Sequence, residues 1–440
     1  MTYVLDIYDR DIIVGAVRFD PQTDTFTFDY DDGWLAGKHA YALSPAFPLR
    51  GANNQTGSFG NIRRFIENLL PEGQALDIVA RAERVTKSNI YGLIRAIGRE
   101  TTGALSFLPE GEMPGPDNES LREIKETELR ERIAERAQVP LAIWDGKVRL
   151  SIAGYQDKLP VYLADDRMYL ANSRFASTHI LKPEPVTPDM AGLVVNEHYC
   201  MRLAAVLRLE VAHVEIRRLP DPVLVVERFD RQRTADGVRR IHIIDTCQAL
   251  DLPVSFKYER NLGSGRDVRN IREGINFERL FSVVQHASNK ATIRLALLRW
   301  ALFQFLIGNS DAHGKNVSFY SRPEGLALAP FYDLVSVVQF PAVDHELAMA
   351  FGDEFDLDAV APYDVADFAK RTRMPRSLLA REMHNMARAA RSSVGPLADD
   401  PVYRVSEQAT VQKLKDFVLS QAMRLEEMVE PMLAVREDDL

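Results

Sequence analysis

The stretch FLIGNSDAHGKNVSFYSRPEGLALAPFYDLVSV (305–337) joins a helical pattern to a polar segment and then to a strand-like run. Apolar residues recur with a period near 3.6 over 291–308, which predicts a helix that ends at Gly308. Acid and amide side chains fill the next residues, and the strand-like LALAPFYDL (326–334) follows them. The sequence therefore predicts a helix, a polar loop and a strand, in that order.

The polar segment contains a spacing that protein kinases use. Asp311 and Asn316 form D-x-x-x-x-N, and Asp333 stands seventeen residues after Asn316. Phosphoryl transfer needs a carboxylate that orients or deprotonates the attacking hydroxyl, and hard oxygen ligands that hold Mg²⁺ against the phosphates. The spacing alone is common, however. A helix C-cap with an Asx turn explains the same residues, and His313 alone fits a structural histidine, so both interpretations stay open on this motif.

Three further segments are candidates for the nucleotide side of such a site. SIAGYQDK (151–158) lies between strand-like runs, but it matches neither G-x-G-x-x-G nor a Walker A motif. Lys182 lies near the end of a strand-like run, and Glu227 and Phe229 follow an apolar one. A hairpin turn, a solvated lysine and an ordinary exit from a strand explain these features equally well.

The rest of the chain divides by its periodicity. Residues 1–30 read as a β-meander, 61–70 as a helix, and 78–97 as a helix pair. Strand-like runs occupy 144–183, a helix is expected over 195–209, and a strand over 221–230. Beyond residue 255 helices dominate, at 278–288, 291–308 and 411–435. A mixed α/β part followed by an all-α part leaves a cleft between them, which is a common place for a ligand.

Composition limits the classes of protein. Basic residues number 54 and acidic residues 63, a net charge of −9, so the chain has no general attraction to nucleic acid. One local exception lies between Lys370 and Arg391, where seven basic residues face a single acid, Glu382; a solvated helix face is the other explanation. Two cysteines in 440 residues favour a reducing compartment. The acidic N-terminus and the lack of a long apolar run predict a cytoplasmic location.

Nine motifs stand in order along the chain: FIENLLPEG, IGRETTGALSFLPE, VRLSIAGYQDK, THILKP, NEHYCMRLAAVL, VERFDR, CQALDLPVSFKYE, IGNSDAHGKNVSFY and APFYDL. Together they make the chain resemble the HipA family of toxin kinases from residue 1 to about residue 340. The resemblance implies an α+β, two-lobed protein-kinase-like fold. Its expected parts are an N-terminal subdomain (1–140), a mixed α/β N-lobe (141–254) and an all-α C-lobe (255–440).

The resemblance also implies roles for individual residues. Asp311 corresponds to the catalytic Asp, Asn316 and Asp333 correspond to the Mg²⁺ ligands, and Ser151 corresponds to the autophosphorylation serine. In the family, phosphorylation of that serine ejects the phosphate loop, consistent with repulsion of nearly two added charges from ATP. The residues implied to bind ATP are Ala153, Gly154, Tyr155, Gln156, Asp157, Lys158, Lys182, Glu227, Arg228, Phe229, His313, Tyr332 and Asp333.

Partners and departures follow from the same resemblance. It implies a HipB-like helix-turn-helix antitoxin, contact with operator DNA through that complex, and a protein substrate such as an aminoacyl-tRNA synthetase or another translation factor.

The chain departs from the family at Ile244, before Asp245, and at Tyr155, where a small residue is usual. By kinase logic Glu197 is a candidate partner for Lys182, although a solvated or capping role explains it too.

Two other functions compete with an active toxin kinase. The first is a transcriptional co-repressor whose kinase fold is vestigial, and the presence of Asp311, Asn316 and Asp333 counts against it. The second is a small-molecule phosphotransferase of related fold. Motifs outside the nucleotide segments, such as CQALDLPVSFKYE, count against that alternative.

Overall fold

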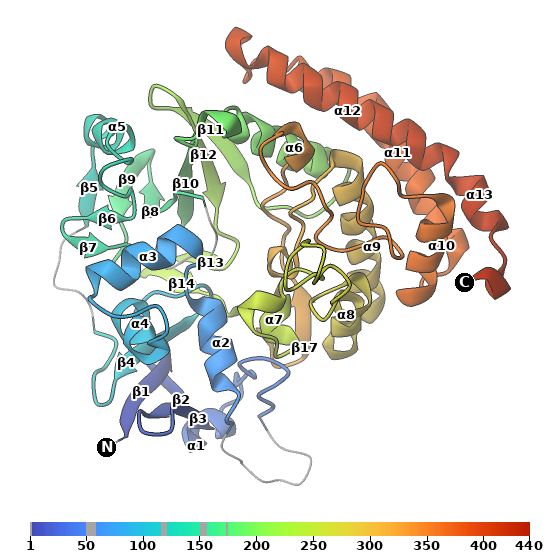
Figure 1. Cartoon of the computed structure of the whole chain (residues 1–440). Coiled ribbons are helices and arrows are strands. Elements are labelled where there is room, and N and C mark those ends of the chain that lie inside the picture. Colours follow the sequence, from blue (N-terminus) through green and yellow to red (C-terminus); the bar gives the residue numbers. More distant parts are fainter. Residues whose placement is uncertain (1, 50–58, 116–120, 150–155, 173–174) are drawn as a thin grey trace. The chain divides into compact units, whose positions relative to one another are not determined.

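The structure, a computed structural model (Figure 1), describes residues 2–49, 59–115, 121–149, 156–172 and 175–440. The chain divides into two units that alternate along the sequence. The first comprises residues 1–183, 217–254 and 319–327, and the second comprises residues 184–216, 255–318 and 328–440. Residue 140, an expected domain boundary, lies inside the first unit, so the division into three parts stays a prediction.

The N-terminal β-meander is confirmed. Strands β1 (Tyr3–Asp9), β2 (Ile12–Asp20), β3 (Thr25–Tyr30) and β4 (Leu105–Pro109) form an antiparallel sheet in the order β3-β2-β1-β4. Alternate residues of β1 face the core: Leu5 and Ile7 are fully buried, and Leu5 lies opposite Val17 of β2. This period-two pattern buries one face of the sheet.

Four helices accompany this sheet in the first unit: α1 (Asp32–Ala36), α2 (Ile62–Leu69), α3 (Gly73–Ala82) and α4 (Ile90–Ile97). Helix α2 ends before Pro71, as the sequence predicts, because a proline disfavours the helical conformation of the residue preceding it. Helix α2 packs beside β3, and α4 packs beside β4.

A six-stranded sheet contains the strands expected at 158–164, 167–171, 178–183 and 221–230, whereas the described part of the run at 147–154 pairs elsewhere. It consists of β5 (Arg122–Ile124), β8 (Leu159–Ala164), β9 (Arg167–Leu170), β10 (His179–Pro183), β11 (Val214–Arg218) and β12 (Pro222–Glu227), in the order β11-β12-β10-β8-β9-β5. Helix α5 (Glu126–Ala134) contributes Leu129 and Ile133 to the same apolar core as Leu159 and Leu181.

Short elements complete the first unit. Strands β6 (Ile143–Trp144) and β7 (Lys147–Val148) pair with each other, as do β13 (Arg231–Thr234) and β14 (Gly237–Arg240). Strands β15 (Ile243–Asp245), β16 (Ser318–Arg322) and β17 (Gly325–Leu328) form a three-stranded sheet, and α7 (Thr246–Ala249) follows β15. Asp245 and Gln248 cap α7 reciprocally, which gives this part of the CQALDLPVSFKYE motif a structural role.

The interior of the first unit contains a network of paired charges. Arg228 donates to both carboxylate oxygens of Asp230 at 3.0 and 2.8 Å, and Arg231 donates to Asp230 at 2.6 Å. Burial alone would raise the pKa of Asp230, but the two guanidinium groups outweigh it and hold that pKa well below the usual range. Glu100 carries the network to Ser177, whose hydroxyl it accepts at 2.7 Å. These bonds therefore fix the RETTG segment (99–103) to the residues that follow β12.

We expect His242 to make the first unit less stable in acid. Its imidazole is 3 % exposed, donates to the Leu43 carbonyl at 2.8 Å, and stacks on Tyr41. Burial lowers the pKa of His242 to about 4 from 6.5. Between those values the unfolded chain binds a proton that the folded chain does not, so the free energy of unfolding falls as pH falls below 6.5.

The free energy of unfolding should fall by about 1 kcal/mol between pH 7.5 and pH 5.5. The measurement is chemical denaturation at each pH, with a signal that reports unfolding of the first unit. His242→Gln keeps an N–H donor and removes the titration, so this part of the pH dependence should disappear. His39→Gln, which replaces an exposed histidine of the same unit, is the matched control. Equal pH dependence in wild type and His242→Gln would contradict the assignment.

The second unit is largely helical, as predicted for the chain beyond residue 255. Its helices are α6 (Leu193–Val206), α8 (Phe277–Ser282), α9 (Lys290–Ile307), α10 (Pro362–Arg371), α11 (Arg376–Ala398), α12 (Gln408–Glu427) and α13 (Val429–Ala434). Helix α11 packs along α12, and both contact α6 and α9. Figure 1 shows α11, α12 and α13 as the orange-red helices at the C-terminal end of the chain.

Helix α9 is the central apolar element of this unit. Eleven of its eighteen residues are buried, among them Trp300 and Phe303, which are fully inaccessible to solvent. Asn289 caps its first turn by accepting the Thr292 N–H at 3.2 Å. Because helix α9 is buried and packed, the polar loop that follows it begins at a fixed position in the second unit.

No helix in the described part of the chain is both long and apolar enough to cross a membrane.

Candidate active site

The loop after α9 begins at a glycine that no other residue can replace without strain. Gly308 ends the helix with a φ of +64°, in the left-handed region. A Cβ placed there would meet Val338 at 2.5 Å and Phe417 at 2.7 Å. Both the backbone conformation and the surrounding side chains therefore require glycine, and the chain turns sharply into Asn309.

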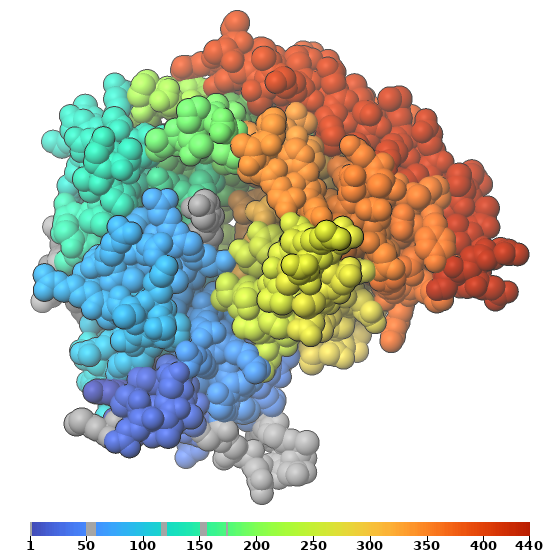
Figure 2. Space-filling model, in the orientation of Figure 1, coloured from blue at the N-terminus to red at the C-terminus, as the bar shows by residue number. Residues whose placement is uncertain are grey.

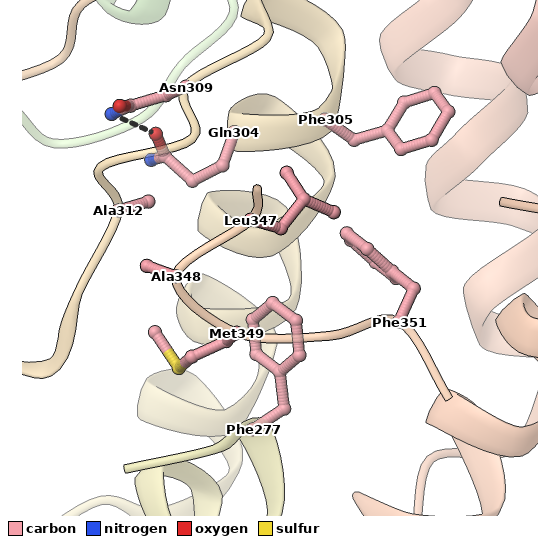
Figure 3. Close-up of a pocket in the computed structure, with 9 residues that line it drawn as sticks. All are labelled: Phe277, Gln304, Phe305, Asn309, Ala312, Leu347, Ala348, Met349 and Phe351. Carbon is pink, nitrogen blue, oxygen red and sulfur yellow. Dashed lines mark hydrogen bonds between the residues drawn. The ribbon is translucent and has the colours of Figure 1, made fainter. Parts of the chain in front are cut away.

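Asn309 and Gln304 brace the start of this loop (Figure 3). The Asn309 amide donates to Gln304 Oε1 at 2.8 Å, and its own oxygen accepts the backbone N–H of Asp311 at 3.1 Å. Both residues are buried and line a cavity of about 10 Å³ together with apolar side chains of α9 and of residues 347–351. A cavity of that size holds one water molecule at most, so it is not the nucleotide site.

Asp311 is the exposed residue of an otherwise buried loop. Its neighbours Ser310 and Ala312 are buried, whereas the side chain of Asp311 reaches solvent. Tyr258 donates its hydroxyl to Oδ1 of Asp311 at 2.6 Å. Oδ2 accepts no hydrogen bond from any residue that the structure describes. One oxygen of the predicted catalytic carboxylate is thus held and the other is available to an acceptor.

Asn316 lies at the end of a short 3-10 helix, η4 (Gly314–Asn316), and is 5 % exposed. Its Nδ2 donates to the backbone carbonyl of Asp311 at 3.3 Å. This bond ties the two ends of the D-x-x-x-x-N motif together and orients the amide. The nitrogen is occupied, which leaves the oxygen, a hard ligand, for a cation.

The segment that carries Asp333 is fastened to the same loop. Tyr332 donates its hydroxyl to the Lys315 carbonyl at 2.6 Å and lies 2.8 Å from the Ser318 hydroxyl. These two contacts flank Asn316, so the chain around Asp333 runs beside the chain around Asn316. The predicted strand is shorter than expected: β17 ends at Leu328, and Asp333 lies beyond it with a φ of +58°. Asp tolerates this left-handed conformation better than most residues, so the backbone can turn here without a glycine.

Asn316 and Asp333 fit a magnesium ion by their chemistry. One amide oxygen and one carboxylate leave most of the coordination positions to water and phosphate oxygens, as is usual for Mg²⁺. Among the described residues, no group of three or more His, Cys, Asp or Glu side chains is placed to hold a metal by itself. An ion held by Asn316 and Asp333 would take its remaining ligands from a nucleotide and water.

The lysines predicted to bind phosphate both belong to the first unit. Lys182 lies on β10, and Lys158 directly precedes β8, the neighbouring strand, where Leu159 lies opposite Leu181 of β10. The two side chains are 7 % and 8 % exposed. Their role in binding phosphate stays a prediction.

The Glu227–Phe229 segment leaves β12 beside the same strands. Glu227 is exposed and lies opposite His179 of β10. The Arg228 guanidinium is engaged with Asp230 and Ser177, so it is a structural group within the first unit. Any contact of this segment with adenine would come from its backbone or from Glu227 and Phe229, and that role stays a prediction.

Several of the predicted site residues belong to the segment 151–158, which the structure describes only in part. Ser151, Ala153, Gly154 and Tyr155 fall outside the described residues. Gln156 and Asp157 are described, and burial raises the pKa of Asp157 above its usual value. Glu197 is 2 % exposed on α6, and its pairing with Lys182 stays a prediction.

The basic stretch over 370–391 carries less available charge than the sequence suggests. Four of its seven cations pair with acids: Arg371 with Asp353 and Asp367, Arg376 with Glu437, Arg381 with Glu382, and Arg391 with Glu426. Surface pairs of this kind reduce the attraction of a helix face for phosphate. The explanation as an ordinary solvated helix face is the stronger one.

Sequence reasoning missed two supporting residues, Tyr258 and Gln304. Tyr258 belongs to the CQALDLPVSFKYE motif, whose role was not assigned, and Gln304 is a polar residue inside an apolar helix. The supporting role of Gln304 could have been predicted from the sequence, because a buried glutamine in such a helix must find a hydrogen-bond partner.

The fold and the loop define a class: an α/β unit with two buried lysines and a helical unit with an Asp–Asn–Asp constellation. Comparison with known proteins identifies the class. Family models match at residues 5–108, the HipA N-terminal domain, and at residues 150–394, the HipA-like C-terminal domain. The chain belongs to the HipA family.

Its relatives include a kinase and a putative kinase from two bacteria. The chain is 43% identical over 391 residues to the serine/threonine-protein kinase toxin HipA of Shewanella oneidensis, covering 88% of this chain and 87% of that protein. It is 34% identical to the putative kinase Y4mE of Sinorhizobium fredii, covering 95% of this chain and 97% of that protein.

A solved structure matches the whole fold. HipA in the Shewanella oneidensis HipA, HipB and operator DNA complex has a TM-score of 0.88 and 39% sequence identity, covering 98% of this chain and 100% of that one. The two-lobed, kinase-like α+β fold expected from the sequence is thereby confirmed.

Proposed function

We propose that this protein is a serine/threonine kinase toxin that transfers the γ-phosphate of ATP to a protein hydroxyl. The observation that carries the proposal is the arrangement of Asp311, Asn316 and Asp333. The carboxylate of Asp311 is exposed, while Asn316 and the chain around Asp333 are fixed beside it by hydrogen bonds. This is the set of groups that phosphoryl transfer requires.

In the proposed reaction Asp311 accepts a hydrogen bond from the acceptor serine or threonine at its available oxygen, Oδ2. The acceptor oxygen bonds to the γ-phosphorus, the bond from that phosphorus to the ADP oxygen breaks, and the hydroxyl proton passes to Asp311. Asn316 and Asp333 would hold Mg²⁺, which neutralises charge on the phosphates when bound. Lys158 and Lys182 would bind the triphosphate, and His313, Tyr332 and residues 227–229 would line the nucleotide.

Regulation and partners are proposed on the family relationship. Self-phosphorylation at Ser151 would switch the kinase off, and a translation factor such as an aminoacyl-tRNA synthetase is the proposed target, with growth arrest as the result. The Shewanella structure is a complex of HipA with HipB and operator DNA. A HipB-like antitoxin that neutralises this chain, and co-repression of its operon on DNA, are proposed by that likeness, in the cytoplasm.

The test incubates the purified full-length chain with γ-phosphate-labelled ATP and Mg²⁺. We expect label on Ser151 of the wild type and none at that position in Ser151→Ala. We also expect label on a protein of a bacterial lysate when a Ser151→Ala kinase is added. Absence of label on the chain itself and on every lysate protein would overturn the kinase and favour the co-repressor with a vestigial kinase fold.

A further inference from the structure

The PVSFKYE segment carries a side chain that reaches the proposed catalytic carboxylate from a distant part of the sequence. The Tyr258 hydroxyl donates to Oδ1 of Asp311 at 2.6 Å, a short bond to a charged acceptor. Oδ2 of Asp311 accepts nothing from the described residues. Tyr258 therefore distinguishes the two oxygens of a carboxylate that would otherwise rotate and present either of them.

The backbone on both sides of Tyr258 is fixed to the loop and to the interior. The Lys257 carbonyl accepts the Gly314 N–H at 2.9 Å, within the loop that carries Asp311. Glu259 is 1 % exposed, accepts from Arg272 at 2.6 Å and accepts the Ala350 N–H at 2.8 Å. Tyr258 is thus bracketed by two anchored residues.

Gly274 shows how closely the chain packs on Tyr258. A Cβ at position 274 would lie 1.7 Å from the Tyr258 carbonyl oxygen and 2.9 Å from the Phe256 carbonyl oxygen. A side chain at this position is therefore sterically excluded. The close approach of the two backbones therefore restricts the position of the chain at Tyr258.

The ring of Tyr258 also has two close neighbours. The His313 ring lies nearly perpendicular to it with ring centroids 5.0 Å apart, and the Lys257 ammonium lies 5.1 Å from its centroid. Residues 261–270, which follow, are exposed or half-buried, and Figure 2 shows this segment in yellow on the surface. The hydroxyl is therefore a fixed group at the edge of the protein, where an acceptor chain can reach Asp311.

We propose that Tyr258 is a positioning residue for phosphotransfer, which holds Oδ1 of Asp311 so that Oδ2 faces the acceptor hydroxyl. This inference rests on the proposed function. A carboxylate misplaced by about 1 Å loses on the order of a hundredfold in rate, so removal of the phenol hydroxyl should slow the transfer step. Nucleotide binding should be unaffected, because Tyr258 acts on the acceptor side through Asp311.

The experiment measures single-turnover self-labelling of the full-length chain at a series of Mg-ATP concentrations. For Tyr258→Phe we expect the maximal rate to fall by about tenfold to a hundredfold, while the ATP concentration at half-maximal rate stays within about twofold. In an Asp311→Asn background the same substitution should change the rate by less than about twofold, because its effect is exerted through the carboxylate.

Tyr363→Phe is the matched control, since Tyr363 of the same unit donates its hydroxyl to the Asp439 carbonyl at 2.9 Å. It should label at the wild-type rate, and all variants should unfold at wild-type temperatures. A wild-type rate in Tyr258→Phe, or an equal further loss in the Asp311→Asn background, would overturn the positioning role alone. A wild type without any label would overturn the proposed function and this inference with it.

Discussion

Asp311→Asn should lower the rate of phosphotransfer by about 10²- to 10⁴-fold, the range for loss of a positioned general base. Asparagine has the shape of aspartate and keeps an oxygen for the Tyr258 hydroxyl, so the loop should keep its geometry. What is lost is the negative oxygen that receives the acceptor proton. The rate is measured as single-turnover transfer from labelled ATP at saturating Mg²⁺.

Nucleotide binding separates a chemical defect from a folding defect. Asp311→Asn should bind a fluorescent ATP analogue as the wild type does, since the carboxylate is not assigned to the phosphates. Asp358→Asn is a suitable control, because Asp358 belongs to the same unit and its side chain is 87% exposed. Transfer by Asp311→Asn at more than about a tenth of the wild-type rate would be incompatible with a general base at this position.

The sequence predicted the order of elements and the residues of the loop, because both leave local signals. A period near 3.6 ending at Gly308 marked α9, and D-x-x-x-x-N marked Asp311 and Asn316. The meander at residues 1–30 was readable for the same reason, since strand alternation is a property of neighbours in sequence.

Contacts between distant segments left no such signal. Tyr258 and Asp311 are 53 positions apart, and the Tyr258 hydroxyl reaches Asp311 only because the chain over 256–259 is bonded to the loop. Asp333 was expected on a strand, but its positive φ places it beyond β17, a conformation that local propensity does not reveal. The pairing of β8 with β10, which places Leu159 opposite Leu181, depends on strand register, which tertiary packing selects.

Asp333→Asn should abolish the contribution of Mg²⁺ to nucleotide binding and lower phosphotransfer by at least about a hundredfold, since a bound metal supplies several kcal/mol of charge stabilisation. Asparagine is the informative substitution, because it tolerates the φ of +58° at this position, whereas alanine would add backbone strain. The measurement titrates ATP into the protein with Mg²⁺ and with EDTA. The wild type should bind more tightly with Mg²⁺, and the variant should bind equally in both.

Asn316→Ala tests whether the two residues serve one ion. If they do, the loss of the Mg²⁺-dependent part of binding in the double variant should equal the loss in either single variant, because one site can be emptied only once. Additive losses would indicate two ions, one for each residue. A normal Mg²⁺ dependence in Asp333→Asn would show that the Asp333 carboxylate is not a ligand of the ion, and the assignment of the metal to this residue would be wrong.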